Sequence, residues 1–141
     1  MVKFFGGTEG LELVLHPMKV ELFRVGRPYE RDEQSDTPRI AGFPILSDPV
    51  HLDTQTAKEL SQILVRGRYG GIPMECKFDP GVALRFVGKS STIEVLVCFH
   101  CGEMLAVRNG KQLEYEYFST SELLPMVKKL FPMDANIQGL E

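Results

Sequence analysis

The residues best suited to chemistry form the stretch 98–101, Cys-Phe-His-Cys, which is followed by Gly102. A cysteine thiolate can bind a soft metal ion and can also attack a disulfide as a nucleophile. In a straight strand, Cys98 and Cys101 would point to opposite faces, about 10 Å apart. They can act together only if the chain turns at Phe99 and His100, and the glycine that follows favours such a turn.

Three hypotheses account for these cysteines. In the first, Cys98 and Cys101 are the pair of a thiol–disulfide oxidoreductase, and His100 favours the Cys98 thiolate. The helix that usually begins at such a motif is missing, because the residues after it predict a strand instead. In the second, Cys98 and Cys101 hold half of a zinc site, Cys76 is the third ligand, and the fourth is His100, His51 or His16. In the third, which we favour, all three cysteines are small apolar residues of the core.

Arg85 and His100 are the candidate binding residues outside the thiol chemistry. Arg85 could bind an anion or a substrate carboxylate. The favoured alternative is an ion pair with Glu94 on the next strand. The sequence contains no serine nucleophile elbow, HExxH motif or glycine-rich phosphate loop, so no catalytic residue is assigned beyond the redox candidates.

The elements that must position these residues follow from hydrophobic periodicity. Helices are predicted at 8–15, 53–65 and 121–131, with Thr8, Asp53 and Ser121 as N-caps. Period-2 alternation predicts strands at 18–25, 74–78, 82–87, 92–99, 103–108 and 111–118. Asp79-Pro80-Gly81 suits a type II turn. Asn109-Gly110 indicates a type I′ hairpin. A long irregular loop is expected at about 26–52.

This order of elements predicts an α+β fold: an antiparallel sheet of about five meandering strands, with two or three helices packed on one face. The chain has 141 residues, of which 43% are hydrophobic and 25% charged. A chain of that size can bury roughly two-thirds of its unfolded surface, so we expect one domain over 1–141. The edge formed by residues 113–118 is rich in aromatic side chains, which leaves dimerisation by strand pairing open.

Charge and cysteine content limit the classes of partner. The 16 basic and 19 acidic residues are interspersed and give a net charge of −3, which argues against nucleic acid and against a membrane surface. No apolar run approaches the roughly 20 residues of a membrane span. The apolar stretch within the first seven residues is too short for a secretory leader. Three cysteines are too few for a disulfide scaffold. We therefore expect a cytoplasmic protein.

Three stretches resemble an uncharacterised bacterial protein family: 43–64, 78–104 and 130–140. The shared pattern is F-x-P-G-x-A-L-R-F, then a strand that ends in C-F-x-C, then F-P-x-D-x-x-I-Q. The family has no assigned activity, so the resemblance implies a single bacterial domain and a shared site centred on Arg85 and Cys98. The function we expect is that of a small non-catalytic binding or accessory protein whose partner is a protein or a small molecule. No cofactor is expected, with zinc as the alternative.

Overall fold

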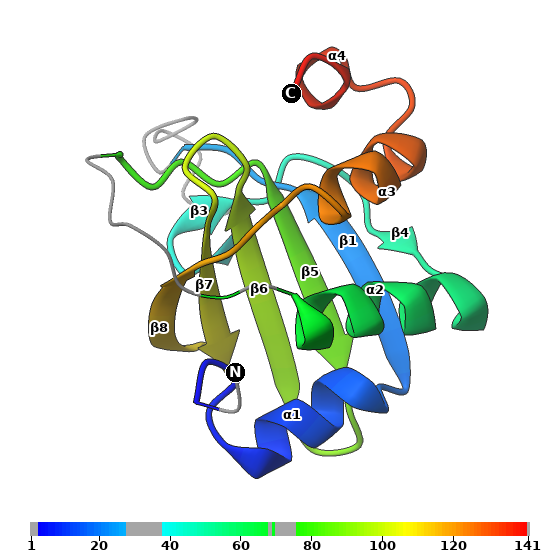
Figure 1. Ribbon diagram of the computed structural model, residues 1–141, viewed down its shortest axis with the longest axis vertical. Coiled ribbons are helices and arrows are strands. Elements are labelled where there is room, and N and C mark those ends of the chain that lie inside the picture. The colour runs from blue at the N-terminus through cyan, green and yellow to red at the C-terminus, as the bar shows by residue number, and fades with distance from the viewer. Residues whose placement is uncertain (1–2, 28–37, 68, 70–75, 141) are drawn as a thin grey trace.

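The computed structural model describes residues 3–27, 38–67, 69 and 76–140. Its main element is a six-stranded antiparallel sheet with the order β4-β1-β5-β6-β7-β8, and a separate pair, β2-β3, forms a second small sheet (Figure 1). The strands are β1 (Lys19–Arg24), β2 (Arg39–Ile40), β3 (Phe43–Pro44), β4 (Val50–His51), β5 (Val82–Val87), β6 (Thr92–Cys98), β7 (Glu103–Arg108) and β8 (Lys111–Tyr117). The helices are α1 (Thr8–Leu15), α2 (Thr54–Arg66), α3 (Leu123–Leu130) and α4 (Ala135–Gln138).

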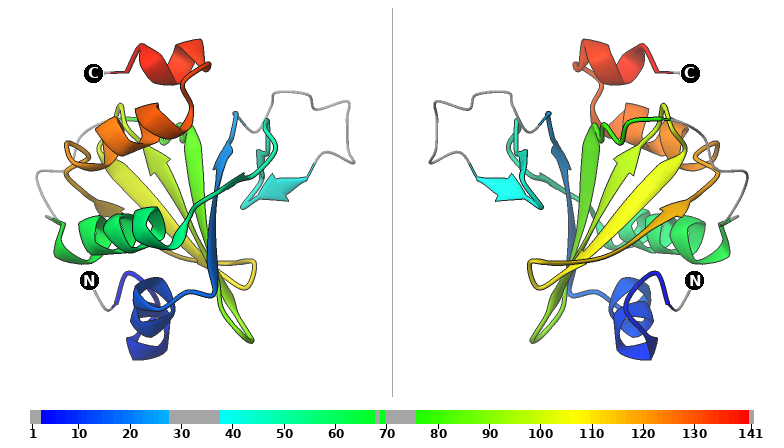
Figure 2. Two further views of the ribbon diagram at one scale, coloured as in Figure 1. Left: turned by 90° about the vertical axis from the view of Figure 1, so that its right-hand side faces the viewer. Right: turned by 90° about the vertical axis from the view of Figure 1, so that its left-hand side faces the viewer.

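Helices α1, α2 and α3 lie on one side of the sheet and the β2-β3 pair lies on the other (Figure 2). The helix side holds the larger core, in which Leu22, Leu84 and Val95 from the central strands meet Leu64 of α2 and Val127 of α3. The opposite side holds a smaller apolar cluster built from Phe23, Leu96, Leu105, Ile40 and Phe43. Apart from Thr92 at its start, β6 is buried along its whole length, as is typical of a central strand covered on both sides.

The α+β class and the three helices are therefore confirmed, with more strands than the five expected. The Asn109-Gly110 hairpin is also confirmed, because both residues have positive φ, 49° and 82°, as a type I′ turn requires. The helix at 53–65 begins as predicted, with the Asp53 carboxylate accepting a hydrogen bond from Thr56 N at 2.7 Å. That bond is the main reason why the pKa of Asp53 is lowered.

Two of the predicted helix caps are wrong. Gly7 precedes α1 and Thr8 is already its first helical residue. At α3, Glu122 takes the cap position without a side-chain hydrogen bond, and the Ser121 hydroxyl lies 3.3 Å from the Ser119 hydroxyl instead. Both helices are nonetheless where the apolar periodicity placed them, because burial of that face fixes a helix more strongly than its cap does.

The segment before β5 also differs from its prediction. The expected strand at 74–78 is wrong for residues 76–78, which belong to no strand, and residues 74 and 75 lie outside the described residues. The expected type II turn is wrong as well, because it needs a positive φ at Gly81 and that φ is not positive. Part of the predicted loop at 26–52 forms β2, β3 and β4, while residues 28–37 lie outside the described residues.

Candidate functional site

The Cys-Phe-His-Cys stretch forms the tight connection between β6 and β7. Cys98 is the last residue of β6 and lies opposite Glu103, the first residue of β7. Gly102 has a φ of 63°, a conformation that glycine adopts without steric cost. The predicted turn is confirmed, and it brings the Cys101 N–H within 3.4 Å of Cys98 Sγ.

The favoured hypothesis of three apolar core cysteines is wrong for Cys76 and Cys101, which form a disulfide at this turn. Cys101 is bonded to Cys76 in a disulfide whose Cα atoms are 5.8 Å apart, and Cys98 is a free, fully buried thiol. The two redox candidates, Cys98 and Cys101, are thus neighbours that are not bonded to each other. His100 is exposed on the same turn.

The proposed zinc ligands are only partly assembled. Cys76, Cys98 and Cys101 come together, but two of the three sulfurs are used in the disulfide. His51 is on β4, where its Nδ1 lies 3.2 Å from the Glu21 carboxylate, and His16 ends α1. Among the described residues, no group of three or more histidine, cysteine or acidic side chains is arranged to hold a metal ion.

Residues 76–81, which we call the strap, cross from this turn to the start of β5. The Cys76–Cys101 disulfide fixes one end of the strap. Near its middle, the Phe78 ring packs edge-on against Phe43 and Tyr115, with ring centroids 5.9 and 5.1 Å away. At the other end, Gly81 N donates to Val97 O at 3.1 Å. The strap therefore crosses the end of the sheet where β6 ends and β5 begins.

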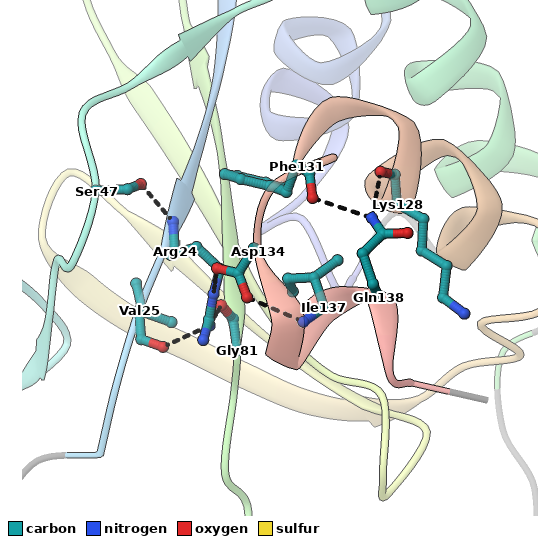
Figure 3. Close-up of polar contacts among 9 residues, drawn as sticks. All are labelled: Arg24, Val25, Ser47, Gly81, Lys128, Phe131, Asp134, Ile137 and Gln138. Carbon is teal, nitrogen blue, oxygen red and sulfur yellow. Dashed lines mark hydrogen bonds and ion pairs between the residues drawn. The ribbon is translucent and has the colours of Figure 1, made fainter.

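Arg24, the last residue of β1, binds the far end of the strap and the C-terminal segment at the same time (Figure 3). Its Nη1 donates to Gly81 O and, at 3.2 Å, to Val25 O. Its Nε donates to Asp134 Oδ2 at 2.6 Å. The side chains of Arg24 and Asp134 are 13% and 24% exposed, so this ion pair is shielded from most of the solvent.

Asp134 has a second role as the N-cap of α4, because its Oδ1 accepts a hydrogen bond from Ile137 N at 3.0 Å. Burial alone would raise the pKa of Asp134, but the Ile137 N–H and the Arg24 guanidinium outweigh it and lower that pKa. Gln138 completes the segment, since its Nε2 donates to Lys128 O at 2.8 Å and to Phe131 O at 3.0 Å. Gln138 thus ties α4 to the end of α3, where Phe131 O also accepts a hydrogen bond from Asp134 N at 3.2 Å.

A pocket of about 320 Å³ opens between the end of β1, the strap and α4. Its charged lining consists of Arg24, Arg27 and Asp79, and Nε of Arg27 lies 3.1 Å from Asp79 Oδ2. The remaining lining residues are Val25, Gly26, Leu46, Pro80, Gly81 and Asn136. The pocket is thus polar, and Arg24 is part of its lining.

Arg85 does not belong to this site. It pairs with Glu94, Nη2 to Oε2 at 2.7 Å, and stacks over the Phe23 ring at 4.6 Å, so the predicted cross-strand pair is present. Cys98 is four residues further along β6 than Glu94, about 13 Å at the rise of a strand. The structure does not bring Arg85 and Cys98 together as the centre of one site.

Sequence reasoning missed Arg24, although a signal for it was present. Val20 and Leu22 alternate with polar residues and mark the face of β1 that packs on the helices, and Arg24 continues that register. A cation at a position of core periodicity needs buried acceptors, and here Gly81 O and Asp134 supply them.

The fold and this site together define a small α+β protein with a disulfide-tethered strap beside a polar pocket. No family model, curated protein or solved structure matches the chain. Among the described residues, the structure contains no helix long and apolar enough to cross a membrane.

Proposed function

We propose that the protein is a non-catalytic binding module whose ligand occupies the polar pocket beside Arg24. The proposal rests on the hydrogen bonds of the Arg24 guanidinium, which do not involve all of its nitrogen atoms. Nε and Nη1 have acceptors within the protein, whereas no acceptor for Nη2 is found among the described residues. A ligand oxygen in the pocket would complete the set, and a guanidinium held on two sides is preorganised to bind it.

The ligand class that fits is a small molecule with a carboxylate group. A volume of about 320 Å³ is near the lower end of small-molecule sites, which span about 300–1,000 Å³. Planar carboxylates match the N–H geometry of arginine. Asp79 also lines the pocket, but its carboxylate is already paired with Arg27, so the carboxylate of the ligand is the group that the pocket recognises.

A bacterial, cytoplasmic setting is part of the proposal and is supported by the composition and by the resemblance of three stretches to bacterial sequences. Disulfides in the cytosol are usually transient, catalytic or redox-sensing. The Cys76–Cys101 bond would then be a reversible tether of the strap that forms one wall of the pocket.

Amide chemical shifts during titration with acetate, glycine and methylammonium test the proposal. Acetate and glycine should shift the Gly26 and Gly81 resonances saturably at millimolar concentration, and methylammonium should not. Asn136→Trp fills the pocket from an exposed position and should abolish these shifts. Met133→Trp is the matched control, because Met133 is 95% exposed in the same segment and does not line the pocket.

Two results would count against the pocket. In one, neither acetate nor glycine shifts the two glycine resonances. In the other, Asn136→Trp responds to acetate as the wild type does, which would place the binding elsewhere on the surface.

A further inference from the structure

The free thiol of Cys98 lies directly beside the disulfide. Its Sγ is 3.4 Å from the Cys101 nitrogen, and an N–Cα bond is about 1.46 Å long, so the sulfur lies within about 5 Å of Cys101 Cα. The turn at 99–102 therefore places the Cys98 sulfur beside the backbone of Cys101, whose own sulfur forms the disulfide.

We propose that Cys98 is the internal exchange partner of the Cys76–Cys101 disulfide. The Cys98 thiol gives up its proton, and the thiolate attacks Sγ of Cys101. The Cys98–Cys101 bond forms, the Cys76–Cys101 bond breaks, and Cys76 leaves as a thiolate that takes up a proton. One disulfide and one thiol are present before and after, so the step needs no outside oxidant or reductant.

The N–H of Cys101 favours this direction of attack. It points at Cys98 Sγ, with 3.4 Å between nitrogen and sulfur. It also fixes Cys98 next to Cys101, the residue whose sulfur must accept the attack, whereas Cys76 belongs to the strap on the other side of the bond.

Exchange releases the strap at one end only. Cys76 is its covalent link to the turn, while Gly81 stays bound to Val97 and to Arg24. The Phe78 ring, packed between Phe43 and Tyr115, then holds the free end by noncovalent contact alone. The disulfide thus tethers the strap at Cys76, and exchange with the buried Cys98 thiol releases that end.

Alkylation of the folded, oxidised protein tests the exchange. Cys98 is fully buried and should not react with N-ethylmaleimide, whereas Cys76 is half-buried once freed. Trypsin places Cys76 in peptide 69–77 and both other cysteines in peptide 90–108. We expect the label on Cys76 to increase with time at pH 8, together with an internal disulfide in peptide 90–108.

The opposite pattern would overturn the proposal. One such result is a label on Cys98 while peptides 69–77 and 90–108 are still joined. A second is a label on Cys101. The third is no label at all, although the denatured protein contains one thiol. Cys98→Ser and Cys98→Ala are the controls, since both should keep the two peptides joined and unlabelled. None of these measurements involves a ligand, so the exchange can be refuted without refuting the pocket, and the acetate titration can fail without refuting the exchange.

Discussion

The ion pair between Arg24 and Asp134 provides the sharpest test of how the C-terminal segment is held. Asp134→Asn removes the negative charge but keeps an N-cap for α4, because asparagine and aspartate are nearly equivalent at that position. Hydrogen bonds to charged groups contribute about 1.5–3 kcal/mol, and fully exposed ion pairs about 0–1 kcal/mol. With side chains 13% and 24% exposed, this pair lies between these cases, and we expect a loss of about 2 kcal/mol.

A double-mutant cycle isolates the pair from the other contacts of each residue. Arg24→Gln should cost more than Asp134→Asn, about 3–4 kcal/mol, because the bonds to Val25 O and Gly81 O are also weakened. In the Arg24→Gln background, Asp134→Asn should cost less than about 0.5 kcal/mol. The measurement is the free energy of unfolding in urea at pH 7, with all variants oxidised. A cost of about 2 kcal/mol in both backgrounds would refute the reasoning and assign the effect to the cap of α4.

The same pair predicts a pH dependence with a definite sign. The folded-state pKa of Asp134 is lowered, so the unfolded chain binds more protons in the acidic range. The stability from Asp134 is therefore fully present above the unfolded pKa of about 3.9 and is lost as the pH falls through the folded value. The stability difference between the wild type and Asp134→Asn should be constant from about pH 8 to 5 and shrink below about pH 4. A difference that grew on acidification would contradict this assignment.

Three further perturbations test other parts of the structure. A Cys98→Ala variant cannot exchange, and its oxidised form should be more stable than its reduced form by about 3.5 kcal/mol. This value is the chain-entropy effect of closing a loop of about 25 residues. Equal urea midpoints of the two forms would show that the strap is not tethered. Leu84→Ala at a fully buried position of β5 should cost about 2–5 kcal/mol, and a loss below about 1 kcal/mol would be incompatible with close packing there. Gly110→Ala should cost about 1–2 kcal/mol because φ is 82° with open space around the site, and an unchanged stability would contradict the type I′ turn.

The parts of the fold that were predictable are those fixed by local chemistry. Asn109-Gly110 predicts its own turn because few other pairs accept positive φ at both corners. Asp53 predicts the start of α2 because its carboxylate reaches an N–H three residues on. The turn at 99–102 was likewise foreseeable from Gly102, which has a positive φ.

The strap was misread because its apolar residues serve contacts distant in sequence. Cys76 and Phe78 alternate with polar neighbours as in a strand, but Cys76 bonds to Cys101 and Phe78 packs between Phe43 and Tyr115. Period-2 alternation reports that alternate side chains are buried, and it does not report whether the backbone pairs with another strand. Only the partners, all of which lie 25 or more residues away, distinguish a paired strand from an unpaired one.

The stretches at 78–81 and 130–138 are about 50 residues apart, yet they meet on one side chain. Gly81 O and Asp134 Oδ2 both accept hydrogen bonds from Arg24, and Gln138 closes the end of α3 beside them. A structural role is therefore sufficient to explain the aspartate and the glutamine of the C-terminal pattern, and Arg85 is explained by its pair with Glu94. These structural roles do not account for Nη2 of Arg24 or for the free thiol of Cys98. Because Gly81 of the strap contacts that guanidinium and Cys76 of the strap is bonded to the turn that contains Cys98, ligand binding and disulfide exchange would act on the same six residues from opposite ends.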